Sequence, residues 1–157
     1  MTTEETIREL KESVRREFIG SEKDFEDVIF ENMDEICGCL GLPKIKAKER
    51  QRLINVDHFH IKPDILVRHE DGTMTVFEVK KANEKYPSTG TSNQMNAVGQ
   101  LLLYRTVIEA IIKAPVRLAL IDNKIYYRTF CAFKGNDLPI TLIDYQDDRL
   151  FVPYWGW

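Results

Sequence analysis

Apolar residues recur at helical spacing through the first forty positions of the chain. A narrow stripe between charged residues consists of Ile7, Leu10, Val14 and Phe18, and a broader one of Phe25, Ile29, Met33, Ile36 and Leu40. The Gly20-Ser21 pair separates the two stripes, and serine is a preferred helix N-cap. The pattern therefore predicts one helix over residues 3–18 and a second over 22–40.

Further along the chain, apolar runs alternate with turn signals. The Asp71-Gly72 pair is a hairpin turn signal between two strand-like runs. The elements that we expect after the second helix are an extended stretch over 44–56, a hairpin within 63–80, a polar loop over 81–93, a helix over 94–113, a central strand over 116–122, a strand over 125–133, and peripheral strands over 140–145 and 150–152.

This order of elements indicates an α/β domain with a mixed central β-sheet flanked by helices. At 157 residues the chain is expected to form one domain. Its expected parts are an N-terminal helix over 1–20, a core over 21–123, and C-terminal strands with an aromatic tail over 124–157.

Composition and charge exclude some classes of protein. No apolar run approaches the ~20 residues needed to cross a bilayer, and the polar N-terminus is not that of a secretory signal. Three cysteines cannot all pair within the chain, which favours reduced thiols and a cytoplasmic location. The net charge of −3 argues against a large nonspecific basic surface for duplex binding.

The hairpin within 63–80 brings candidate chemistry together. Asp64 opens its first strand, and Glu78 and Lys80 lie two residues apart on the second, so their side chains share a face. Two carboxylates form a hard-oxygen site of the kind that Mg²⁺ prefers, and a neighbouring ammonium can orient a water molecule.

Pro63, Asp64, Glu78 and Lys80 resemble the signature of the PD-(D/E)XK nucleases, the restriction-endonuclease-like superfamily. Gln100 and Tyr104, four apart in a predicted helix, resemble the Q-x-x-x-Y motif of the branch that includes RecB-type nuclease domains. The family also carries an acidic residue near the start of its first core helix. The resemblance spans about residues 21–104 and implies an αβββαβ core, the restriction-endonuclease-like fold.

The resemblance implies a metal-dependent nuclease that hydrolyses phosphodiester bonds of DNA with Mg²⁺ or Mn²⁺. It implies that Asp64, Glu78 and the backbone carbonyl of Val79 bind the metal and that Lys80 positions the attacking water. Gln100 and Tyr104 would orient the lysine region or contact the phosphate, or else only hydrogen-bond the sheet. The alternative is a catalytically inactive domain of the same fold that acts as a nucleic-acid-binding or structural partner.

The helix predicted over 22–40 offers two candidates for the additional acid. Glu22 projects near the middle of the buried face, where a carboxylate is poorly suited to packing but suited to a metal, and Glu26 lies towards the border of that face. Both acids are also explained by the helix dipole alone, because negative charge near a helix N-terminus is stabilising. We therefore expect Glu22 as a metal-supporting residue, with Glu26 as the alternative.

Cations at every second position from residue 44 form the candidate nucleic-acid-binding row, which consists of Lys44, Lys46, Lys48, Arg50 and Arg52. In a strand all five share one face, which can track a phosphate backbone or simply be solvated. Lys81 is a further candidate, although it points away from Lys80. His58 and His60 share a strand face, and His69 beside the hairpin turn is expected to be exposed. The first helix and the aromatic tail over 154–157 are candidate interfaces of a homodimer.

Overall fold

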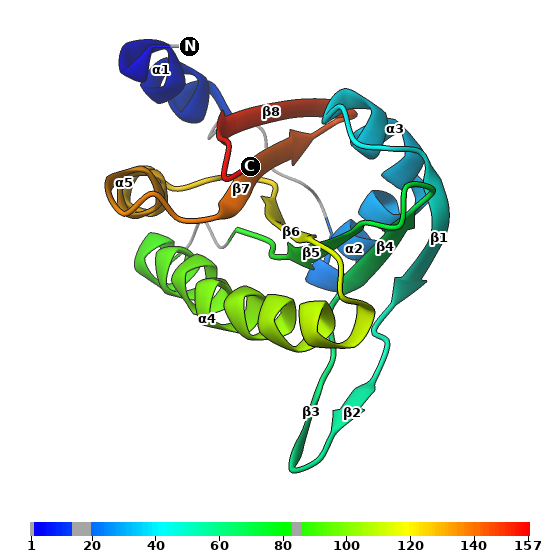
Figure 1. The fold of residues 1–157 in the computed structure, drawn as a ribbon. Helices are drawn as coiled ribbons and strands as arrows, with labels where there is room; N and C mark the ends of the chain where they lie inside the picture. Colours follow the sequence, from blue (N-terminus) through cyan, green and yellow to red (C-terminus); the bar gives the residue numbers. More distant parts are fainter. Residues whose placement is uncertain (1, 14–19, 83–85) are drawn as a thin grey trace.

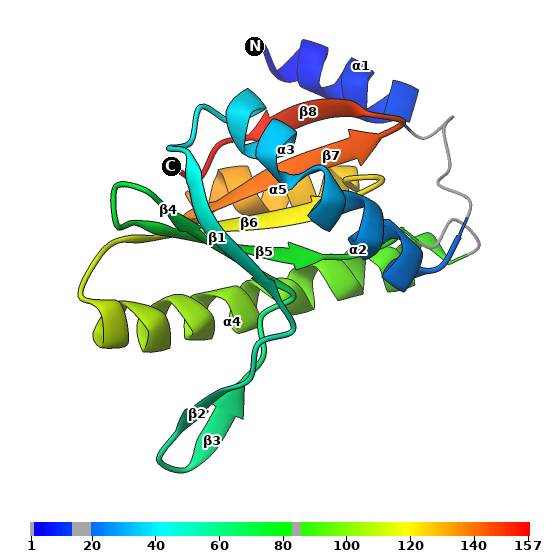
Figure 2. The ribbon, with the colours of Figure 1, turned by 90° about the vertical axis from the view of Figure 1, so that its right-hand side faces the viewer.

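The computed structural model describes residues 2–13, 20–82 and 86–157 as three layers, with one mixed sheet between two sets of helices (Figures 1 and 2). One face of the sheet is covered by α2 (Glu22–Glu31) and α3 (Met33–Cys39), and the other by α4 (Pro87–Ile112) and α5 (Tyr127–Gly135). The expected α/β class, with a mixed sheet flanked by helices, is confirmed.

The central sheet has six strands in the order β1-β4-β5-β6-β7-β8. Their bounds are Ile45–Arg50 for β1, Ile65–His69 for β4, Met74–Val79 for β5, Val116–Asp122 for β6, Ile140–Gln146 for β7 and Arg149–Tyr154 for β8. The β5-β6 and β6-β7 pairs are parallel, and the other three pairs are antiparallel. The order α2-α3, β1, β4, β5, α4, β6 is the αβββαβ core expected from the sequence.

The N-terminal helices differ from the prediction in their bounds. The first helix, α1, is described over Thr3–Ser13, so Val14 and Phe18 lie outside the described residues. Ser21 caps α2 as predicted, in a reciprocal capping box with Asp24. The prediction of one continuous helix over 22–40 is wrong, because Asn32 departs from helical geometry and separates α2 from α3. All five members of its predicted stripe are nevertheless buried.

A small two-stranded sheet interrupts the extended stretch predicted over 44–56. It pairs β2 (Ile54–Val56) with β3 (Phe59–Ile61) and projects from the body as an arm between β1 and β4 (Figures 1 and 2). Gln51, with a φ of 50°, ends β1 and separates it from the arm. The stretch is therefore two strands in different sheets.

The polar loop predicted over 81–93 is wrong, because α4 begins at Pro87. Proline is favoured in the first turn of a helix, where no intrahelical partner awaits its missing N–H. Gly90 lies in the next turn against the Tyr126 ring, leaving no room for a side chain. The polar composition of these turns reflects their exposure and not irregular structure.

The strand predicted over 125–133 is also wrong, because residues from Tyr127 onward form α5. Thr129, Phe130 and Phe133 are its buried residues, at the spacing of one helix face. Tyr127 is 51% exposed, so the alternation that indicated a strand was accidental.

Two hydrophobic clusters fill the spaces on either side of the sheet. One lies between the sheet and α4 with α5, and the other between the sheet and α2 with α3. Every residue of β7 is buried, which corrects its prediction as a peripheral strand. Ile111, near the C-terminal end of α4, is 57% exposed. The aromatic tail packs on the body, where the Trp157 Nε1 donates to the Leu118 carbonyl oxygen at 2.8 Å.

Cys37, Cys39 and Cys131 are all free. In the described parts of the chain, no helix combines the length and apolar character needed to cross a membrane.

Candidate active site

Asp64 and Glu78 meet at the open end of the β4-β5 hairpin, away from its Asp71-Gly72 turn. The main-chain N–H of Asp64 donates to Glu78 Oε1 at 3.1 Å, and the N–H of Val79 donates to Asp64 Oδ2 at 2.9 Å. This reciprocal arrangement follows from antiparallel pairing, in which Ile65 lies opposite Phe77. The hairpin therefore brings these two side chains to the same place.

The Glu78 carboxyl is the more buried of the pair, at 3% exposure for the residue. Burial, and after it the negative charge of Asp64, raise its pKa to about 8, although the hydrogen bond from the Asp64 N–H and the charge of Lys80 act in the opposite direction. Without a cation, Glu78 therefore holds a proton at neutral pH more readily than an exposed glutamate. A divalent cation at this position would relieve both the burial and the repulsion.

Lys80 follows β5 directly and is held beside β6, since its N–H donates to the Ile121 carbonyl oxygen at 2.9 Å. Its charge lowers the pKa of both Glu78 and Glu22, which places the ammonium among the acids. Two residues on, the N–H of Ala82 donates to Asn123 Oδ1 at 2.8 Å in a buried contact. The backbone that carries Lys80 is thus fixed on both sides.

Glu22 and Glu26, the two candidates for the additional acid, both lie in α2 near this cluster. Partial burial raises the pKa of Glu22, while Lys80 and a hydrogen bond from the Lys81 main chain lower it. Glu26 is only 8% exposed and accepts from Arg50 Nε at 3.2 Å. Glu22 therefore lies on the lysine side of the cluster and Glu26 on the side of Asp64.

Gln51 is a member of the site that the sequence pattern did not indicate. Its Nε2 donates to Asp64 Oδ1 at 3.0 Å and lies 3.2 and 3.3 Å from the two carboxylate oxygens of Glu26. In a regular strand, Gln51 would lie on the face opposite Arg50 and Arg52. Its positive φ turns the side chain towards the carboxylates, and the hydrophobic and polar pattern of the sequence does not predict a positive φ at this position.

The two residues of the predicted Q-x-x-x-Y motif differ in their surroundings. Tyr104 is buried and its hydroxyl lies 3.5 Å from the Lys62 carbonyl oxygen. Burial raises the pKa of Tyr104 to about 12, with the charges of Glu78 and Asp64 adding to the effect. Gln100 is exposed, and within the described residues it makes no hydrogen bond to the carboxylates.

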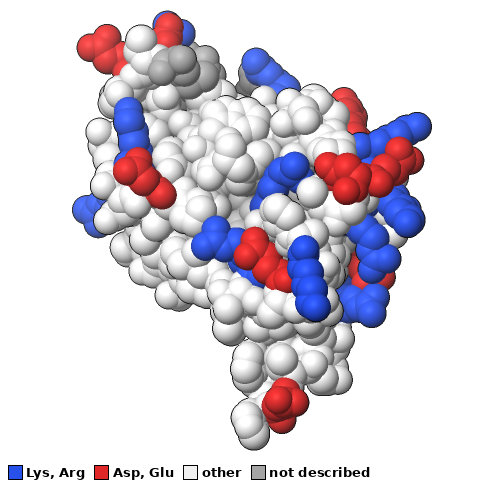
Figure 3. All heavy atoms as spheres, in the orientation of Figure 1, with Lys and Arg blue, Asp and Glu red and all other residues white. Residues whose placement is uncertain are grey.

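The predicted row of five cations does not share one face. Lys48 Nζ donates to the Phe30 carbonyl oxygen at 2.7 Å, and Arg50 NH1 pairs with Asp27 at 2.6 Å, so both contact α2. A register shift between Ile45 and Ala47 breaks the alternation within β1. Lys44 and Lys46 are exposed. Figure 3 shows positive and negative side chains interspersed on the face that it displays.

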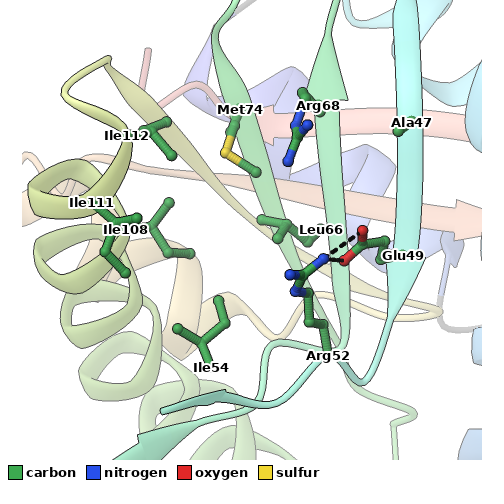
Figure 4. Close-up of a pocket in the computed structure, with 10 residues that line it drawn as sticks. All are labelled: Ala47, Glu49, Arg52, Ile54, Leu66, Arg68, Met74, Ile108, Ile111 and Ile112. Atoms are coloured by element: carbon green, nitrogen blue, oxygen red, sulfur yellow. Dashed lines mark hydrogen bonds and ion pairs between the residues drawn. The ribbon is translucent and has the colours of Figure 1, made fainter. Parts of the chain in front are cut away.

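Arg52 lies on the other side of the sheet, where it pairs with Glu49 at 2.7 Å. Both residues line a pocket of about 140 Å³ whose walls come from β1, β4, β5 and the last turns of α4 (Figure 4). Met74, at the start of β5, lines this pocket, whereas Glu78 lies near the end of the same strand. The pocket is therefore separate from the carboxylate site, and Arg52 belongs to the pocket.

His58 and His60 are exposed on the β2-β3 arm. The expectation that His69 is exposed is wrong. Its ring is buried between the Pro43 carbonyl oxygen and the Thr75 hydroxyl, each 2.7 Å away. It therefore joins the β1-β4-β5 corner of the sheet to the segment that precedes β1.

A second pair of acids, Asp122 and Asp144, lies side by side near the C-terminal ends of the parallel strands β6 and β7. Burial raises the pKa of Asp122 to about 8, and the Gln94 side chain donates to it at 2.8 Å. Gln146 donates to Asp144 at 3.2 Å and to the Asn123 carbonyl oxygen. These buried contacts hold the turn whose Asn123 supports the segment after Lys80.

The carboxylate site suits a cation that keeps part of its hydration. Across residues 2–13, 20–82 and 86–157 there is no group of three or more His, Cys, Asp or Glu side chains arranged to hold a metal ion. Mg²⁺, however, is commonly bound through one or two carboxylates, with water and substrate oxygens completing its shell. Asp64 and Glu78, with the carbonyl of Val79 between Glu78 and Lys80, fit this mode of binding.

Neither the family models nor the curated proteins contain a match to this chain. Among solved structures, the chain is similar to a repair endonuclease from Pyrococcus abyssi, with a TM-score of 0.49 and 19% sequence identity. The alignment covers 80% of this chain and 47% of that one, so the chain corresponds to about half of the endonuclease.

Proposed function

We propose that this chain is a metal-dependent nuclease that hydrolyses phosphodiester bonds of DNA. The observation that supports the proposal is the reciprocal main-chain contact of Asp64 and Glu78, with Lys80 in the same cluster. It matches the order of acids and lysine in the PD-(D/E)XK signature. The preference for DNA comes from that resemblance.

In this proposal Asp64, Glu78 and the Val79 carbonyl hold Mg²⁺ or Mn²⁺. A bound divalent ion supplies charge relief for the phosphate and a water of lowered pKa. Asp64 keeps its orientation through the Val79 N–H, and Glu78 through the Asp64 N–H. Burial of Glu78 makes an unneutralised charge there unfavourable, which strengthens the attraction for a cation.

Lys80 supplies the ammonium. Its position among Glu22 and Glu78 lets it orient the attacking water or stabilise the charge that develops on the phosphate. Glu22 or Glu26 completes the acidic set from α2. The Tyr104 hydroxyl, whose pKa is raised by burial and by the charges of Glu78 and Asp64, stays protonated and remains a hydrogen-bond donor.

Substitution of Asp64→Asn and Lys80→Met tests the proposal, with Asp34→Asn on the exposed side of α3 as the matched control. Cleavage of labelled single-stranded, duplex and branched DNA is measured with Mg²⁺, with Mn²⁺ and with EDTA. We expect metal-dependent cleavage that falls at least about 100-fold in both site variants, as removal of charge-stabilising groups does. The control should cleave like the wild type.

Each other result has a definite meaning. Wild-type activity in either site variant would remove that residue from the mechanism. DNA binding by a wild-type chain that cleaves none of the substrates would favour the catalytically inactive alternative. Circular dichroism of each variant separates loss of chemistry from loss of fold.

A further inference from the structure

Gln51 lies between two acids that belong to different elements. Glu26 comes from α2, and Asp64 precedes β4. The Nε2 atom of Gln51 is 3.0 Å from Asp64 Oδ1 and 3.2 and 3.3 Å from the two oxygens of Glu26. One side-chain amide thus joins Glu26, one of the two candidates for the additional acid, to Asp64.

The backbone of Gln51 adopts an unusual conformation that a main-chain hydrogen bond stabilises. Its φ of 50° lies in the left-handed region, which residues other than glycine and asparagine adopt with backbone strain. The main-chain N–H of Gln51 donates to the Asp64 carbonyl oxygen at 3.0 Å, beside the side-chain bond to the same residue. Strain of this kind clusters at functional sites, where the surroundings maintain it.

The chemistry of the amide suits a site that must attract a cation. An amide nitrogen carries two N–H groups, so it can donate to both carboxylates at once. Because the amide is neutral, it joins the two carboxylates without neutralising Asp64, while Glu26 also forms an ion pair with Arg50 at 3.2 Å. A lysine or arginine in the same place would neutralise the charge that binds the metal.

The acids have separate partners on their other sides, so the amide contact is what couples them. Asp64 Oδ2 accepts from the Val79 N–H, and Glu26 Oε1 accepts from Arg50. These contacts fix each carboxylate to its own surroundings. Among the described residues, Gln51 is the side chain that bonds to both Glu26 and Asp64.

We propose that Gln51 is a positioning residue which holds Asp64 and Glu26 in the arrangement that binds a divalent cation. The inference rests on the proposed function, since it concerns the metal site of that nuclease. Partners that orient metal ligands from outside the coordination shell typically change metal affinity 10–100-fold when removed.

Calorimetric titration with Mn²⁺, without nucleic acid, tests the inference on the wild type and three variants of Gln51. Gln51→Ala removes the amide, and Gln51→Gly removes it while relieving the left-handed backbone. We expect both to bind Mn²⁺ about 10–100-fold more weakly. Gln51→Lys should bind more weakly still, because its charge cancels that of the acids.

Asn96→Ala, which removes an exposed amide from α4, is the matched control and should bind Mn²⁺ as the wild type does. Thermal unfolding without metal shows that each variant is folded. If the wild type binds Mn²⁺ and Gln51→Gly binds within twofold of it, the role of Gln51 is overturned and the proposed function stands. If the wild type binds no Mn²⁺, the metal site itself is overturned and the role of Gln51 with it.

Discussion

Replacing Glu78 with glutamine changes the charge of the site with little change in shape. The variant keeps an oxygen to accept from the Asp64 N–H, and its added N–H₂ group can donate to the Asp64 carboxylate. Glu78→Gln therefore removes the buried ionisable group and retains the contact that closes the hairpin.

The magnitude follows from the pKa of Glu78, which burial raises from 4.5 to about 8. At about 1.36 kcal/mol per pH unit, this gap corresponds to roughly 5 kcal/mol, which relaxation of the site reduces. A raised pKa means that the folded state binds the proton more tightly than the unfolded state. The stability contributed by that proton is present below about pH 4.5 and is lost as the pH rises to about 8.

The measurement is urea unfolding of Glu78→Gln and wild type between about pH 5 and pH 9, without divalent metal. We expect the variant to gain stability relative to wild type as the pH rises, by at least about 2 kcal/mol at pH 9. Asp122, whose pKa is also raised by burial to about 8, titrates in both proteins and cancels in the difference. Glu70→Gln, at an exposed position, is the control. A difference that stays constant across this pH range would refute the reasoning.

Three further predictions concern the fold and the cations. His69→Ala should destabilise the chain by about 2–4 kcal/mol in denaturant unfolding, because it leaves a cavity and two unsatisfied partners; an unchanged midpoint would contradict this. Gly90→Ala should cost about 1–3 kcal/mol, since the new carbon overlaps the Tyr126 ring, and wild-type stability would show that the ring moves freely. Lys46→Glu should weaken DNA binding and lower the dependence of log K on log salt concentration by about 1, because Lys46 is exposed. Lys48→Glu should mainly lower stability, because Lys48 contacts α2. Equal effects of the two variants on DNA binding would support the prediction that both cations lie on one DNA-binding face.

The candidate site was predictable where it depends on local pairing. Asp64 and Glu78 stand on one hairpin, and the Asp71-Gly72 turn sets the register that brings them together. Side-chain alternation also placed Glu78 and Lys80 on one face. These relations extend over few residues, and the sequence pattern contains them.

The missed features depend on contacts between distant segments. Gln51 reaches Glu26 only because its backbone turns left-handed, which strand periodicity does not predict. The helix α5 was mistaken for a strand because its buried residues include Thr129 and Phe130, which also suit a sheet. The row of cations was predicted to share a face because strict strand alternation was assumed, whereas a bulge in β1 and the packing of α2 separate its members.

The β2-β3 arm has a consequence for variation in length. Its two ends are already joined, because the Gln51 N–H donates to the Asp64 carbonyl oxygen at the base. Doubling the length of a segment closed in this way costs only about 0.6 kcal/mol of loop entropy. The spacing from Asp64 to Glu78 is set by the paired register of β4 and β5. Homologous chains should therefore insert and delete residues at the exposed Asp57-His58 turn while the interval between the two acids stays constant, and a peptide tag placed at that turn should leave the fold intact.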